Sequence, residues 1–161
     1  MKRTRVVFLA LLLASLTLSI ASCKKHENKD TEKPTITIAE PKEGECVLVG
    51  KSMHLEMDLA DNEALASYKI NVHNASDGHS HGATRQGGSG SKPFFYEKVH
   101  EEIAGQRNAH VHTHEVVIPA DAKLGKYHLM VYCTDKAGNE TYRAIGIELT
   151  NDPSKVKEHH E

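Results

Sequence analysis

Apolar and polar residues alternate along the middle of the chain in short runs separated by turn signals. The runs at 52–61 (SMHLEMDLAD), 66–74 (ASYKINVHN), 125–135 (GKYHLMVYCTD) and 140–150 (ETYRAIGIELT) place apolar side chains at alternate positions. Successive side chains of a β-strand point to opposite faces, so this period of two predicts strands with one buried face. The sequence therefore predicts an all-β domain, built as an antiparallel β-sandwich.

The chain begins with a segment typical of secretion. Residues 1–5 (MKRTR) are basic, and the apolar run at 6–20 is short for a membrane-spanning helix. The segment IASC that follows resembles the lipobox of bacterial lipoproteins. This resemblance implies cleavage before Cys23 and lipid on its thiol and on the new amino terminus, which would anchor the protein in a membrane. The alternative is an ordinary secretory signal in which Cys23 is incidental.

Polar segments flank the predicted domain. The stretch from Cys23 to Lys33 is charged and reads as a tether, and Lys24 after the lipid-bearing cysteine favours the outer membrane, on its periplasmic or its surface face. The C-terminal stretch is also polar. We therefore expect a signal peptide (1–22), a flexible tether (23–33), one β-sandwich domain (34–151) and a polar tail (152–161).

Two cysteines remain for the domain if Cys23 carries lipid. Cys46 and Cys133 are an even number in an oxidising compartment, which is compatible with a disulfide between them. The sequence does not give their separation, so two free thiols are the alternative.

Histidine is overused, with 12 residues among 161, and most of them lie in clusters. In the segment HVHTH, His110, His112 and His114 occupy alternate positions, so on a strand their imidazoles leave the same face. Alternate Cβ atoms of a strand are roughly 6.5–7 Å apart, which lets neighbouring histidines share an ion. We expect His112 and His114 to be the better ligands. Their parity continues into Val116 and Ile118, which predicts a site where the buried face opens to solvent.

A second cluster lies upstream in NVHNASDGHSHG. His73 ends a predicted strand, while His79 and His81 lie between glycines that let a loop turn around a cation. Asp77 would supply a carboxylate ligand or orient an imidazole. The strand of His73 is expected to pair antiparallel with that of His128, which places these two histidines at the same end and outer face. The loop would have to fold over the sandwich edge to reach HVHTH, which is expected in the opposite sheet.

The other histidines are expected to be ordinary solvated side chains. His54 shares its strand face with Glu56 and Asp58, away from the apolar residues. We therefore expect His54→Ala to leave metal binding unchanged. His26 falls in the tether, and His159 and His160 fall in the polar tail.

Imidazole ligands with one carboxylate favour Zn²⁺, with Cu²⁺ or Ni²⁺ as alternatives. Surface histidines without metal, including a pH-sensitive surface, are the competing interpretation. Calcium prefers oxygen ligands and would bind elsewhere. The segments DNE at 61–63 and DKAGNE at 135–140 are expected near one end of the sandwich, although Asp and Asn are also routine turn formers.

Longer stretches resemble a known family. The segment GKYHLMVYCTDKAGNE is similar to the penultimate strand and final hairpin of bacterial immunoglobulin-like domains, and PTITIAEPKEG followed by DLADNEALASYKINVH looks like their first strands. The combination of DNEALASYKINVH, DGHSHG and DKAGNE on a lipoprotein resembles a family of Bacteroidota lipoproteins known only as domain of unknown function 4625. The resemblance implies an immunoglobulin-like fold and brings almost no biochemistry, so function must be argued from the site.

The leading hypothesis is a lipid-anchored module that captures Zn²⁺ or Cu²⁺ or delivers it to an envelope transporter or another envelope protein. The alternative is an adhesion or assembly module that binds a protein or a glycan, with incidental histidines. We expect no enzyme, because the chain has no H-E-x-x-H motif, and Glu101 and Glu102 near His100 lack a counterpart that completes an acid–base site. The formal charge of −2, with signs interspersed, predicts no nucleic-acid binding.

Overall fold

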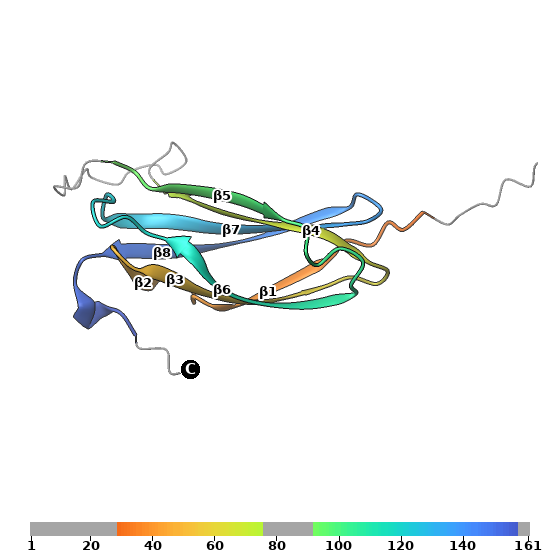
Figure 1. Ribbon diagram of the computed structural model, residues 1–161, viewed down its shortest axis with the longest axis horizontal. Helices are drawn as coiled ribbons and strands as arrows, with labels where there is room; N and C mark the ends of the chain where they lie inside the picture. Colours follow the sequence, from red (N-terminus) through yellow and green to blue (C-terminus); the bar gives the residue numbers. More distant parts are fainter. Residues whose placement is uncertain (1–28, 76–91, 158–161) are drawn as a thin grey trace, which may run out of the picture.

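The computed structural model describes residues 29–75 and 92–157, which form two packed β-sheets (Figure 1). One sheet has the strand order β1-β3-β6 and the other the order β2-β8-β7-β4-β5. The predicted all-β sandwich of the immunoglobulin-like kind is confirmed. The elements are β1 (Thr35–Glu40), β2 (Glu45–Leu48), β3 (Ser52–Ala60), β4 (Leu65–Asn74), β5 (Phe95–His100), β6 (Asn108–Val117), β7 (Gly125–Asp135), β8 (Glu140–Thr150) and the 3₁₀-helix η1 (Pro153–Lys155).

The five-stranded sheet is mixed rather than wholly antiparallel. Strand β2 pairs with β8 in parallel, whereas the other strand pairs in the described residues are antiparallel. Because β1 belongs to the three-stranded sheet, the chain crosses between the sheets from β1 to β2. This crossing places β2 beside the beginning of β3, where it forms one wall of the groove described below.

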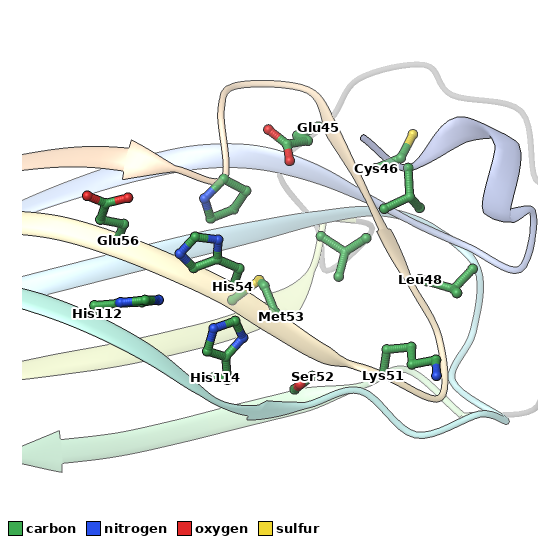
Figure 2. A pocket seen from close by; sticks show the side chains of 13 residues that line it. Glu45, Cys46, Leu48, Lys51, Ser52, Met53, His54, Glu56, His112 and His114 are labelled. Carbon is green, nitrogen blue, oxygen red and sulfur yellow. The ribbon is translucent and has the colours of Figure 1, made fainter. Parts of the chain in front are cut away.

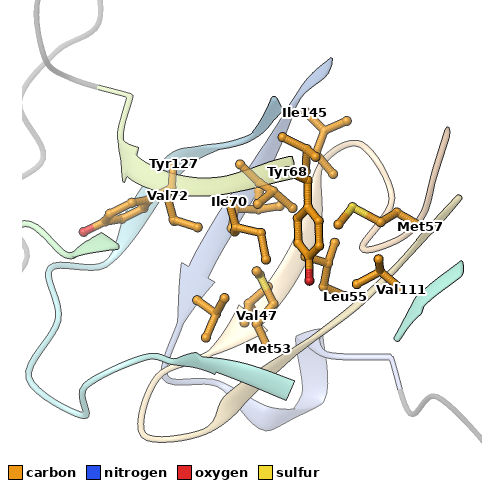
Figure 3. Packing of buried hydrophobic residues seen from close by; sticks show 14 of the residues in the cluster. Val47, Met53, Leu55, Met57, Tyr68, Ile70, Val72, Val111, Tyr127 and Ile145 are labelled. Atoms are coloured by element: carbon orange, nitrogen blue, oxygen red, sulfur yellow. The ribbon is translucent and has the colours of Figure 1, made fainter. Parts of the chain in front are cut away.

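The apolar side chains that alternate in the sequence fill the space between the sheets (Figure 3). On β3, Met53, Leu55, Met57 and Leu59 are each at most 1% exposed, and the intervening residues point the other way. Burying each such side chain contributes about 1.5–3 kcal/mol. A slip of one residue would turn all four toward solvent, so the core fixes which face of β3 points outward.

Tyr127 anchors the beginning of β7. Its ring is fully buried, and its hydroxyl donates a hydrogen bond of 2.7 Å to the carbonyl oxygen of Lys123, four residues upstream. The same hydroxyl accepts a 3.1 Å hydrogen bond from the backbone N–H of Phe94. A tyrosine that bonds back to the chain at this corner is typical of immunoglobulin-like sandwiches.

Cys46 and Cys133 are both free, so the disulfide considered from their even number does not form. Cys46 lies opposite Glu148 of β8, whereas Cys133 on β7 lies opposite Thr141 of that same strand. Seven residues of β8 separate these two positions (148 − 141 = 7), which corresponds to roughly 23 Å along the strand. A disulfide requires Cα atoms within about 7 Å, so the two thiols are too far apart to bond.

Candidate metal centre

The histidines of β6 face carboxylates of β3 on the outer face of the three-stranded sheet. Glu56 pairs with His112 across the two strands, and Asp58 pairs with His110. The residues between them on both strands are buried, so these four side chains leave the opposite, solvent-facing side. The predicted common face of His110 and His112 is therefore confirmed.

A β-bulge interrupts the ladder at the beginning of β3. Leu55 pairs with Thr113 but Met53 pairs with Val116, so β6 has one residue more than β3 in this interval. The single residue His54 therefore stands opposite two residues of β6.

The bulge changes which residues of β6 point outward: even-numbered residues do so up to His114, but from Val116 on they point into the core. His114 is exposed, whereas Val116 and Ile118 are fully buried. The prediction that His114 shares its face with Val116 and Ile118 is therefore wrong: the extra residue, Glu115, lets the imidazoles stay outside while the following apolar side chains turn inward. The three imidazoles lie on the outer face of the sheet, beside a groove that the core residues Val47 and Met53 also line.

Three imidazoles gather at this point: His54 from β3, and His112 and His114 from β6 (Figure 2). The ring of His54 stacks on that of His114 at a centroid distance of 4.9 Å and an interplanar angle of 17°. The centroids of His54 and His112 are 4.8 Å apart, and those of His112 and His114 are 5.3 Å apart. His54 is half-buried, and the other two are exposed.

One ring nitrogen of each of these three histidines lies within 4.8 Å of the others. Tetrahedral zinc with Zn–N bonds of 2.0–2.1 Å requires ligand nitrogens about 3.3 Å apart. The rings of His112 and His114 are exposed, so rotation of their side chains can bring the ring nitrogens from 4.8 Å to about 3.3 Å apart without moving the backbone of β6. The trio can thus supply three neutral nitrogen ligands from two adjacent strands.

A groove of about 1020 Å³ adjoins the trio. His54, His112, His114 and Glu56 lie at one part of its wall, and Cys46 on β2 lies at another (Figure 2). Glu56 is the carboxylate that the β3–β6 register places beside the imidazoles. A bound ion would therefore have an open coordination position facing solvent, with a negative charge close by.

His110 has a different partner. Its Nδ1 lies 2.9 Å from a carboxylate oxygen of Asp58, and its Nε2 lies 3.6 Å from one of Glu56. The hydrogen bond with Asp58 is the main cause that raises the pKa of His110 above its ordinary value. A histidine held in this way favours its protonated form, which cannot bind metal. His110 is therefore a neighbour of the candidate centre, and the described residues do not place it among the ligands.

His73 and His128 form a separate pair. They lie directly opposite each other on β4 and β7, with ring centroids 5.4 Å apart, as the expected antiparallel pairing requires. Both face outward from the five-stranded sheet, because Val72 and Leu129 beside them are fully buried. The trio lies on the outer face of the other sheet, so the core separates the pair from it. The structure does not bring His73 and His128 into one site with His112 and His114.

Four predicted site residues lie outside the described residues. These are the lipidation candidate Cys23 and the loop candidates Asp77, His79 and His81.

His54 is the member of this trio that the sequence does not predict, because its alternation with apolar residues is typical of an ordinary solvated histidine. Its alternation with Met53 and Leu55 correctly indicated an outward side chain. The pairing of β3 with β6 was the missing information, since it alone brings His54 to His112 and His114. The histidines recurring on the outward faces of both strands were the only signal in the sequence.

Glu115, the extra residue of the bulge, is a carboxylate partner of His100 that is not evident from the sequence. Nε2 of the buried His100 lies 2.6 Å from a carboxylate oxygen of Glu115, and Nδ1 lies 3.2 Å from one of Glu102. The Tyr68 ring stacks on the imidazole at 4.5 Å, and Tyr68 donates a hydrogen bond to Glu102. These contacts join the edges of the two sheets, since β5 belongs to one and β6 to the other.

The family model described as "Domain of unknown function (DUF4625)" matches residues 21–150, so this chain belongs to that family. No curated protein matches the chain. Within the described residues, no helix is long and apolar enough to cross a membrane.

Proposed function

We propose that this protein binds a transition-metal ion through His54, His112 and His114. Zn²⁺ is the first candidate, with Cu²⁺ or Ni²⁺ as alternatives, because all three ligands are imidazole nitrogens. The observation that carries the proposal is the convergence of these nitrogens to within 4.8 Å of one another on two adjacent strands.

Metal capture or delivery is the role that this geometry supports best. Structural zinc sites are usually closed by four protein ligands, whereas this trio offers three and opens onto a groove. His112 and His114 are exposed, so an ion can enter and leave without opening the core. The adjacent carboxylate of Glu56 favours a cation electrostatically. An exchangeable ion suits a protein that passes its metal to an envelope transporter or another envelope protein.

The lipid anchor completes the proposal. The lipobox-like segment before Cys23 supports a mature domain held on a tether at the outer membrane, facing the periplasm or the cell surface. Replacing Cys23 with Ala should abolish acyl labelling and release the protein from membranes. Retention of both in the variant would refute the anchor while leaving the metal site untouched.

The metal site is tested by electron paramagnetic resonance of the full-length protein, purified without a histidine tag and loaded with one equivalent of Cu²⁺. Nitrogen hyperfine structure from several imidazoles is expected, and it should simplify in His54→Ala. The matched control is His73→Ala, which changes a half-buried histidine on the opposite sheet. A spectrum that His54→Ala leaves unchanged would refute the trio as the site.

An adhesion or assembly module is the second candidate, and the outer face of the five-stranded sheet favours it. Phe95, Val99 and Tyr142 are 64%, 55% and 63% exposed on this face. Tyr132 lies beside Tyr142. The Lys69 ammonium lies 4.3 Å from the centre of the Tyr132 ring. Exposed apolar side chains of this kind mark surfaces that bind a protein or a glycan. Loss of cell-surface or glycan-array binding in Tyr142→Ser, with metal binding intact, would favour this alternative.

A further inference from the structure

Three aspartates meet at the end of the sandwich that receives the N-terminal segment. Asp30 precedes β1, Asp61 follows β3, and Asp135 ends β7. One carboxylate oxygen of each lies within 4.8 Å of the others. In Figure 1 the segment before β1, the β3–β4 turn and the β7–β8 hairpin share this end, opposite η1.

The surrounding hydrogen bonds hold all three carboxylates in place. Asp135 accepts hydrogen bonds from the backbone N–H and the side-chain amide of Asn139, at 2.8 and 2.6 Å. The same amide donates to the carbonyl oxygens of Asp30 and Glu32. The N-terminal segment is therefore attached to the β7–β8 hairpin through Asn139.

Within residues 29–75 and 92–157, basic side chains do not compensate the negative charge of this cluster. Among the described residues, no lysine, arginine or histidine nitrogen lies within ion-pair distance of any of the three aspartates. One oxygen of Asp61 accepts hydrogen bonds from the N–H groups of Glu63 and Ala64. The other, Oδ1, exposes less than 1 Å² to solvent and has no hydrogen-bond donor in the described part of the chain. A buried, unpaired carboxylate oxygen is costly unless a cation or a proton neutralises it.

The carboxyl group of Asp135 favours its ionised form. Burial opposes ionisation of the carboxyl group, but hydrogen bonds from Asn139 and from the N–H groups of Gly138 and Ala137 outweigh it and lower the pKa of Asp135. Asp135 is only 2% exposed, so the negative charge that these hydrogen bonds favour lies inside the protein. A cation bound at the cluster would neutralise this charge.

We propose that Asp30, Asp61 and Asp135 bind a calcium ion. Carboxylate oxygens from several chain segments, without nitrogen or sulfur ligands, suit a hard cation. Calcium tolerates irregular coordination, whereas magnesium demands a near-ideal octahedron, and this cluster is drawn from three separate segments. Asp61 Oδ1 is the oxygen that gains its missing partner.

This site is independent of the histidine trio. His54 and Asp61 are seven residues apart on and just after β3 (61 − 54 = 7), which corresponds to roughly 23 Å along the extended chain. Its consequence is also different. Asp30 follows Cys23 by seven residues (30 − 23 = 7), so a bound ion would fasten the N-terminal segment to the end of the domain.

The test measures the thermal midpoint of the full-length protein in a chelator and at CaCl₂ concentrations up to about 10 mM, since extracellular calcium modules bind with Kd values of about 10⁻⁴–10⁻³ M. Calcium should raise the midpoint of the parent by several degrees. Asp61→Asn keeps an oxygen for the Glu63 and Ala64 N–H groups and removes the charge. It should melt no lower than the parent in chelator and lose the calcium-dependent rise.

Asp30→Asn provides a second variant outside the strands, and its apparent Kd should be at least 10-fold weaker. Asp121→Asn, an exposed aspartate outside the cluster, is the matched control and should respond like the parent. Tryptic cleavage after Lys29 should slow with calcium in the parent and not in Asp61→Asn. The proposal is overturned if calcium does not raise the parent's midpoint, or if Asp61→Asn and Asp30→Asn respond to calcium as the parent does.

Discussion

Glu56 of β3 lies directly opposite His112 of β6, so the central strand of the three-stranded sheet presents a carboxylate beside a candidate metal ligand. The apolar residues on either side of Glu56 fix this pairing, because they are buried and a one-residue slip would expose them. The same packing that forms the core therefore determines which acid faces which histidine.

Replacing Glu56 with Gln should weaken Zn²⁺ binding by about 10–100-fold, the usual effect of removing a group that supports metal ligands. The variant keeps the side-chain length and loses the charge next to His112 and His110. Competition with a chromophoric chelator would measure the change. Glu101→Gln, an exposed acid of the β5–β6 connection, is the control and should leave the affinity unchanged.

The Asp58–His110 pair predicts a pH-dependent contribution to stability. The pKa of His110 is raised in the folded protein, mainly by its hydrogen bond with Asp58. The contribution should be fully present below the unfolded histidine pKa of about 6.5 and lost as the pH rises through the higher folded value. Asp58→Asn should lower the pKa of His110 in an NMR titration and reduce stability only on the acid side. An unchanged titration curve in this variant would contradict the assignment.

Tyr127→Phe should destabilise the domain by about 1–3 kcal/mol, because it leaves the buried N–H of Phe94 and the carbonyl of Lys123 without their partner. Urea unfolding followed by circular dichroism measures this loss. Tyr142→Phe removes a hydroxyl from a 63% exposed side chain and should change the stability little. Equal effects of the two substitutions would show that the Tyr127 hydroxyl is not the anchor described above.

The thiols of Cys46 and Cys133 should react very differently in the folded protein. Burial raises the pKa of the Cys133 thiol to about 12, with the nearby charges of Asp61 and Asp135 adding to the effect. Cys46 is half-buried on β2. In a Cys23→Ala variant, a thiol reagent should label Cys46 first and Cys133 only after unfolding. If neither cysteine is labelled in urea without reductant, the two thiols are bonded to each other and the assignment as free thiols is wrong.

The sequence predicted strands β3, β4, β7 and β8 and the outward faces of the histidines on these strands and on β6, because alternation with buried apolar residues reports both. It did not predict how β3 and β6 align, since register depends on contacts between distant segments. His54 was therefore separated from His112 and His114 in the sequence interpretation. The bulge opposite His54 adds a second failure, because one extra residue in β6 reverses the parity that relates His114 to Val116.

Calorimetric titration of Zn²⁺ into the full-length protein, purified without a histidine tag, tests the central claim most directly. The parent should bind about one ion per chain, and His54→Ala should weaken that event by more than about 100-fold, since loss of a ligand exceeds loss of its supporting group. His73→Ala should bind like the parent, because the core separates it from the trio. Equal losses in the two variants, or an His54→Ala protein that binds like the parent, would contradict a metal centre at His54, His112 and His114.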